Sequence, residues 1–129
     1  MVKLARGSVL VVDDDPHNRK LIETLLRADG FIVASCDSGA AGLAAIAANP
    51  PDLVLLDLMM PGMDGFEVVR RLKADPRCSR LPIVMVTALD DAASRARLAA
   101  AGIDRILAKP VDRWQLKSCV EALLGRGEG

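Results

Sequence analysis

The sequence predicts a three-layer α/β/α sandwich, doubly wound around a five-stranded parallel sheet with five helices. Short apolar runs rich in Val, Ile and Leu alternate along the chain with longer segments of helical spacing, which is typical of consecutive βαβ units. Most of the short runs are continuously apolar, as expected for strands that helices cover on both faces. Right-handed crossovers then bring the carboxyl ends of all strands to one edge, where such folds bind ligands.

The expected strands are four or five residues long, and turn residues or charged residues bound them. They are Val9–Asp13, Phe31–Ser35, Leu53–Asp57, Ile83–Thr87 and Arg105–Ala108.

The first two helices have clear boundary signals. The first begins at Asp15-Pro16 and ends near Gly30, because Asp caps a helix, Pro suits its first position and Gly suits its end. The second runs from about Ser38 to Ala48 and stops at Pro50-Pro51, since neither proline has a backbone N–H. Helical spacing predicts the buried faces Leu21, Leu25 and Ala28 in the first, and Ala40, Leu43 and Ala47 in the second.

The remaining three helices follow the third, fourth and fifth strands. One begins at Asp64, which forms a capping-box pattern with Glu67, and ends before Asp75-Pro76. The others run from about Asp90 to Ala101 and from about Asp112 to Leu124. The expected buried residues are Phe66, Val69 and Leu72, and in the last helix Leu116, Val120 and Leu123.

Composition limits the class of protein. With 129 residues the chain has the length of one domain, with a core over about 8–124; residues 125–129 are expected to be a flexible tail or the first residues of a linker. Lys plus Arg and Asp plus Glu both number 17, so no global field recruits nucleic acid or an anionic membrane. No apolar segment approaches the roughly 20 residues that cross a bilayer, and no signal peptide is evident. We therefore expect a soluble, cytoplasmic protein.

Polar residues interrupt the apolar runs where four of the strands end. Asp13 and Asp14 end or follow the first strand, Asp57 ends the third, Thr87 ends the fourth and Lys109 follows the fifth. An acid after one strand is commonly just a helix cap. Acids, a hydroxyl and a lysine at four strand ends instead indicate a site at the ligand-binding edge of the sheet.

The three acids need a counter-charge if they lie together. Two carboxylates about 4 Å apart repel by ~4 kcal/mol at an effective dielectric of 20. A Mg²⁺ ion removes this repulsion, because it prefers carboxylate oxygens, keeps several waters and completes its shell with phosphate oxygens. With Lys109 as a permanent positive charge, the arrangement suits phosphoryl transfer, and Asp57 on the central strand is the natural acceptor.

The same residues carry a family resemblance. The segments Val11–Asp15, Leu55–Gly65, Val86–Ala88 and Ala108–Pro110 resemble, in order and spacing, the four signature segments of response-regulator receiver domains of the CheY-like superfamily. The resemblance extends from about Ser8 to Leu124. It implies the strand order 2-1-3-4-5 of the flavodoxin-like fold.

The resemblance also implies a two-component or phosphorelay function. Asp57 would accept a phosphoryl group from the phosphohistidine of a sensor histidine kinase or histidine phosphotransfer protein, and would switch the binding of a downstream effector. Lys109 would pair with the phosphoryl group, and Thr87 would follow it inward. The Lys109-Pro110 bond is often cis in the family. The chain would be a monomer or weak dimer.

The metal site is implied in the same way. Mg²⁺ would be held by Asp14, Asp57 and the backbone carbonyl of Met59, with Asp13 assisting through water. One position departs from the family pattern: Ile106 stands where Tyr or Phe is usual. An aromatic rotamer switch cannot operate there, so we expect the output surface around the fourth helix, fifth strand and fifth helix to respond more weakly or differently.

Two other function classes are disfavoured. A Mg²⁺-dependent phosphatase with an aspartate nucleophile places a second Asp two residues on, where this chain has Met59. A flavin-binding domain of this fold needs a Ser/Thr-rich phosphate loop, where this chain has three consecutive acids that start at Asp13. We therefore expect a signalling acceptor and not an enzyme that acts on an external substrate.

His17 is expected on the surface, and Trp114 as an anchor over the sheet edge, with a binding hot spot as the alternative.

Overall fold

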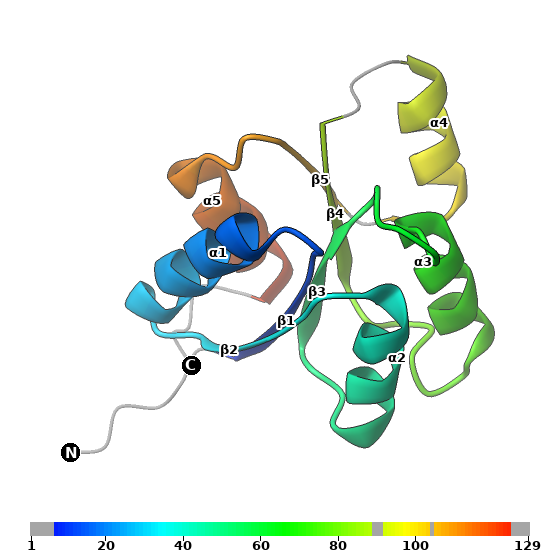
Figure 1. Ribbon diagram of the computed structural model, residues 1–129, viewed down its shortest axis with the longest axis horizontal. Helices are drawn as coiled ribbons and strands as arrows, with labels where there is room; N and C mark the ends of the chain where they lie inside the picture. The colour runs from blue at the N-terminus through cyan, green and yellow to red at the C-terminus, as the bar shows by residue number, and fades with distance from the viewer. Residues whose placement is uncertain (1–6, 89–91, 104, 125–129) are drawn as a thin grey trace.

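Five strands alternate with five helices along the chain (Figure 1). The structure is a computed structural model, and it describes residues 7–88, 92–103 and 105–124. The elements are β1 (Ser8–Val12), α1 (Pro16–Ala28), β2 (Ile32–Cys36), α2 (Gly39–Ala48), β3 (Leu53–Asp57), α3 (Gly65–Ala74), β4 (Ile83–Thr87), α4 (Ala92–Ala100), β5 (Arg105–Ala108) and α5 (Arg113–Leu124).

The strands form one parallel sheet in the order β2-β1-β3-β4-β5. This confirms the expected fold class and strand order. Helices α1 and α5 cover one face, and α2, α3 and α4 cover the other (Figure 1). No helix in the described ranges is long and apolar enough to cross a membrane.

Alternate residues of the central strands enter separate cores. Val9 and Leu55 pack with α1 and α5, whereas Leu10 and Leu56 pack with α2, α3 and α4. Because both faces of β1 and β3 are covered, these strands are apolar at nearly every position. The polar residues at their carboxyl ends therefore stand out against the strand sequence.

The predicted strand and helix positions need small corrections. The strands β3, β4 and β5 have the predicted bounds, but β1 begins one residue earlier than predicted and β2 one residue later. The predicted faces of α3 and α5 are confirmed at Val69, Leu72, Leu116 and Val120, all of which are buried. The predicted start of the fourth helix at Asp90 and the predicted tail over 125–129 lie outside the described residues.

The predicted buried face of α1 is wrong by one position. Ile22 and Leu26 are buried, whereas Leu21 is 43% exposed and Ala28 is also exposed. Leu25 packs at the margin of the core. Apolar residues occur in adjacent pairs along this helix, so helical spacing alone fits two neighbouring stripes.

The predicted face of α2 is wrong for a related reason. Gly39, Gly42 and Ile46 are buried, and Ala40 and Ala47 are exposed. The helix consists almost wholly of small or apolar residues, so its sequence lacks the polar contrast that marks an outward face. Leu43, the third predicted residue, is partly buried against the core.

Gly65, the first residue of α3, lies against the backbone at the carboxyl end of β3. Its N–H donates to the carbonyl of Leu58 at 2.8 Å, while Asp64 caps the helix by accepting from the N–H of Glu67 at 3.0 Å. A Cβ at position 65 would lie 2.9 Å from the backbone oxygen of Asp57 and 2.9 Å from the Cα of Leu58. Only glycine allows this close approach without moving the backbone.

We expect Gly65→Ala to lower the free energy of unfolding by about 1–3 kcal/mol, because the added methyl group meets backbone atoms that cannot rotate away. Urea denaturation measures the loss. Gly42→Ala is the comparison, since its added Cβ would meet only the Val12 side chain, at 2.8 Å. The loss should be larger for Gly65→Ala, and equal or reversed losses would contradict this explanation.

Candidate functional site

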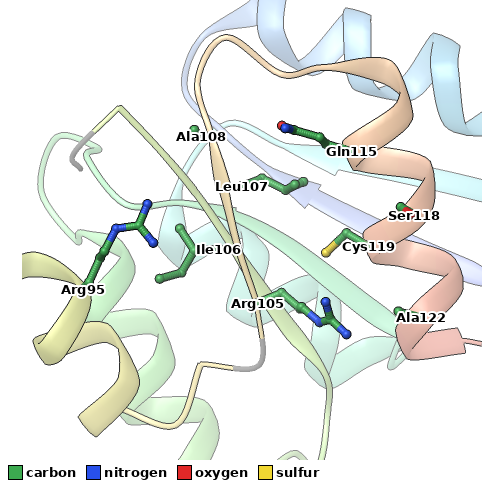
Figure 2. Close-up of a pocket in the computed structure, with 9 residues that line it drawn as sticks. All are labelled: Arg95, Arg105, Ile106, Leu107, Ala108, Gln115, Ser118, Cys119 and Ala122. Carbon is green, nitrogen blue, oxygen red and sulfur yellow. The ribbon is translucent and has the colours of Figure 1, made fainter. Parts of the chain in front are cut away.

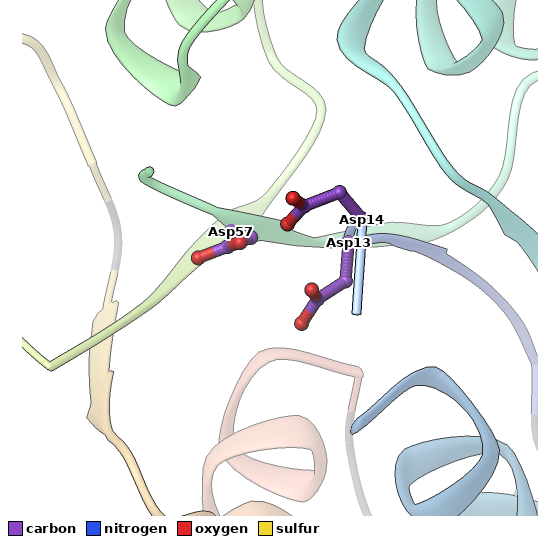
Figure 3. Close-up of side chains that lie close together, drawn as sticks. All are labelled: Asp13, Asp14 and Asp57. Atoms are coloured by element: carbon purple, nitrogen blue, oxygen red, sulfur yellow. The ribbon is translucent and has the colours of Figure 1, made fainter. Parts of the chain in front are cut away.

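Three acids meet at the carboxyl edge of the sheet (Figure 3). Asp13 and Asp14 follow β1, and Asp57 is the last residue of β3, the neighbouring strand. One carboxylate oxygen from each lies within 4.8 Å of the other two. The structure thus brings together the acids that the sequence predicted to converge.

Lys109 reaches this cluster from the loop after β5. Its Nζ lies 3.1 Å from Oδ1 of Asp57 and 3.7 Å from Oδ2 of Asp13. The backbone N–H of Lys109 donates to the carbonyl of Thr87 at 2.9 Å, which ties the loop to the end of β4. The Lys109-Pro110 bond is cis, as the resemblance implies.

The acids of the site differ in their exposure to solvent. Asp13 and Asp57 are 1% and 3% exposed, whereas Asp14 is exposed. Thr87 is buried at the end of β4, one residue beyond Val86, the register partner of Asp57. Met59 lies two residues past Asp57 and is 65% exposed.

The pKa of Asp57 is raised to about 6, chiefly by burial and also by the nearby Asp13 and Asp14, against the hydrogen bond and charge of Lys109. Burial alone would lower the pKa of Lys109, but its contacts with Asp57 and Asp13 outweigh burial and raise the pKa. Lys109 therefore stays charged at neutral pH. One ammonium among three carboxyl groups leaves a net negative site whenever the acids are ionised.

The residues present fit a hard divalent cation. The three potential ligands are carboxylate oxygens within 4.8 Å of one another, and one of the three residues is exposed. Mg²⁺ favours such oxygen ligands and retains waters on its open side. A cation would also offset the desolvation and repulsion that raise the pKa of Asp57.

Two contacts at the site were missed from the sequence. The side-chain amide of Asn18 donates to Oδ2 of Asp13 at 2.5 Å, and the guanidinium of Arg19 donates to the backbone oxygen of Asp13 at 2.8 Å. Both residues lie at the start of α1, the helix that follows the Asp13 strand. Polar side chains in the first turns after an acidic strand end were the available signal.

The departure at Ile106 lies beside a cavity of about 430 Å³ between α4, β5 and α5. Figure 2 shows Ile106 on the α4 side of β5 and Leu107 on the α5 side. Ile106 is partly buried against the core beneath α4. An aliphatic side chain therefore occupies the position where an aromatic one is usual in the family.

The other expectations have mixed outcomes. His17 is exposed, as predicted, and its backbone N–H donates to the Asp15 side chain that caps α1. The prediction that Trp114 anchors the sheet edge is wrong, because this residue is 66% exposed. Arg113 and Lys117 lie 5.5 and 5.8 Å from its ring centroid, so the ring faces solvent and cations in the first turns of α5.

A family comparison agrees with the site geometry. The sequence model of the response regulator receiver domain matches residues 9–121. The chain belongs to this family. A receiver domain works in two-component signalling, in which response regulators interact with histidine kinases.

Individual relatives support the same assignment. The response regulator PleD of Caulobacter vibrioides is 43% identical over 115 residues, which are 89% of this chain but 25% of that protein. The receiver domain thus spans about a quarter of that relative. A putative response regulator from Chloroflexus aurantiacus J-10-fl has a similar structure, with a TM-score of 0.87, 34% identity, and coverage of 92% of this chain and 97% of that one.

Another solved structure is the receiver domain of the sensor histidine kinase PA1611 from Pseudomonas aeruginosa PAO1, described with a magnesium ion coordinated in its active site cleft. It matches with a TM-score of 0.85 at 29% identity and covers 92% of this chain and 98% of that one. Receiver domains of both response regulators and kinases therefore share this fold.

Proposed function

We propose that this receiver domain accepts a phosphoryl group on Asp57 in a Mg²⁺-dependent reaction and that the modification switches the binding of a downstream effector. The donor would be the phosphohistidine of a sensor histidine kinase or a histidine phosphotransfer protein. The observation that supports this most strongly is the ammonium of Lys109, 3.1 Å from the buried carboxylate of Asp57. A charged donor at this distance can stabilise negative charge on a transferred group.

The proposed reaction is a single displacement. A carboxylate oxygen of Asp57 attacks phosphorus, the bond from phosphorus to the donor imidazole nitrogen breaks, and the nitrogen keeps the electron pair. Lys109 stabilises the equatorial oxygens, and the acid must be ionised to attack. Thr87, buried at the end of the adjacent strand, would donate its hydroxyl to a phosphoryl oxygen only after transfer and would so report the modification.

The residues that would hold Mg²⁺ are Asp14, Asp57 and the backbone carbonyl of Met59, with Asp13 acting through a bound water. When bound, the ion would neutralise the acidic cluster and the negative charge on the transferred phosphoryl group. The carboxylate oxygens within 4.8 Å of one another support this assignment. So does the magnesium described for the Pseudomonas receiver domain.

We expect a small phosphoryl donor such as acetyl phosphate to add one phosphoryl group per chain in the presence of Mg²⁺ and almost none in EDTA. Intact-mass spectrometry measures the addition. Hydrolysis of a generic phosphomonoester, followed in parallel, should show no steady-state turnover. Many turnovers per chain would instead support a phosphatase, and equal uptake in EDTA would contradict the role of the cation.

The extent of the unit is part of the proposal. The described residues form one sheet with a helical layer on each face. This arrangement supports a single receiver domain over about residues 8–124, which we propose acts as a monomer or weak dimer.

A further inference from the structure

The carboxylate of Asp13 accepts hydrogen bonds from donors other than Lys109, which donates to Asp57. Its Oδ1 accepts from the N–H of Asp15 at 2.9 Å, and its Oδ2 accepts from the side-chain amide of Asn18 at 2.5 Å. The Nζ of Lys109 is 3.7 Å from that same Oδ2, beyond hydrogen-bond range. Lys109 therefore hydrogen-bonds Asp57, while Asn18 supplies the short side-chain hydrogen bond to Asp13.

The backbone of Asp13 is held as well. Its N–H donates to the carbonyl of Cys36 at 3.1 Å, and its carbonyl accepts from Arg19 at 2.8 Å. Asn18 and Arg19 are adjacent residues of α1, and the Asp15 cap fixes the start of that helix. Both the main chain and the side chain of Asp13 are thus fixed relative to α1.

The Asn18 side chain is uncharged, which is important beside a cation site. Asp13 is 1% exposed, so its carboxylate needs hydrogen-bond donors to offset lost hydration. A lysine or arginine at position 18 would supply a donor but would also cancel the negative charge that attracts Mg²⁺. An amide fixes the carboxylate and leaves its charge intact.

We propose that Asn18 is a positioning residue for the Mg²⁺ site, which holds the Asp13 carboxylate in place and thereby sets the affinity for the ion. A carboxylate that is already ordered loses less entropy when a ligand binds. Partners that orient metal-site ligands typically contribute 10–100-fold in metal affinity. The inference rests on the proposed function and adds a residue that acts through Asp13.

Titration with Mg²⁺ alone, followed by calorimetry, tests the proposal. We expect Asn18→Leu to raise the Kd for Mg²⁺ by about 10-fold. Asn49→Leu is the matched control, because Asn49 is exposed and directly follows α2. The Kd of this variant should equal that of the wild type. Asn18→Ala removes the same donor without adding a bulky side chain, and it should raise the Kd for Mg²⁺ by the same factor. This variant takes the place of Asn18→Leu if Asn18→Leu does not fold.

Two further readouts separate positioning from a structural role. The Mg²⁺ concentration that half-saturates phosphorylation by acetyl phosphate should rise about as much as the Kd, while the rate at saturating Mg²⁺ stays close to that of the wild type. In the Asp13→Asn background, Asn18→Leu should change the Kd no further, because the carboxylate through which it acts is gone.

The possible outcomes lead to different conclusions. An unchanged Kd together with a lower free energy of unfolding in EDTA would assign Asn18 a structural role and overturn the inference. A raised Kd in a protein that accepts no phosphoryl group would support the positioning role and overturn the proposed function. A wild-type chain that binds no Mg²⁺ would overturn both.

Discussion

Asp57→Asn is expected to abolish phosphoryl uptake from acetyl phosphate in the presence of Mg²⁺. The amide keeps the size of the side chain and its position at the end of β3, but it lacks the anionic oxygen that attacks phosphorus. Intact-mass spectrometry should show one added group on the wild type and none on the variant.

The matched control is Asp52→Asn at the opposite end of the same strand. Asp52 precedes β3 and accepts from the N–H of Ser8 at 2.8 Å, a bond that an amide oxygen can also accept. Uptake by this variant should equal that of the wild type. Uptake by Asp57→Asn at the wild-type level would show that another residue is the acceptor.

The same Asp57→Asn substitution is expected to stabilise the metal-free protein by about 3 kcal/mol at pH 8. The pKa of Asp57 is raised to about 6 in the folded protein, chiefly by burial. The folded state thus binds this proton more tightly than the unfolded state does, so stability falls as the pH rises from about 4 to about 6, where the unfolded chain loses the proton before the folded one does. The neutral amide removes that loss.

The pH dependence gives the sign of the effect. The advantage of Asp57→Asn should be full above pH 6 and should disappear below about pH 4, where Asp57 is protonated in both folded and unfolded wild type. Saturating Mg²⁺ should narrow the gap at pH 8, because the ion binds the ionised carboxylate of the folded wild type. Urea denaturation measures both effects, in EDTA at several pH values and with saturating Mg²⁺ at pH 8. A stability gap that widens on acidification would refute the explanation.

The fold and the acidic site were predictable from sequence because the same residues carry both signals. Continuously apolar runs such as Leu53–Leu56 indicate a parallel sheet, and the polar residues at the ends of four strands mark the shared edge. Parallel pairing then brings Asp13 and Asp57 to the same edge of the sheet. The order of the strands came from resemblance, since apolar runs alone do not specify which strands are neighbours.

Several features depend on packing and were not predictable. The buried face of α1 turns on whether Leu21 or Ile22 faces the sheet, and both are equally apolar. The exposure of Trp114 follows from the rotation of α5, which periodicity does not resolve to a single residue. The hydrogen bond from Asn18 to Asp13 depends on the angle between β1 and α1, which the sequence alone does not specify.

The site of modification can be located directly after reaction with acetyl phosphate. Borohydride reduces an acyl phosphate to an alcohol, so a phosphorylated aspartate becomes homoserine, which peptide mass spectrometry can place in the sequence. We expect homoserine at position 57 when the reaction contains Mg²⁺, and unmodified peptide when it contains EDTA. Modification at another residue, or equal modification of Asp57 in EDTA, would contradict a cation-dependent acceptor built from Asp13, Asp14, Asp57 and Lys109.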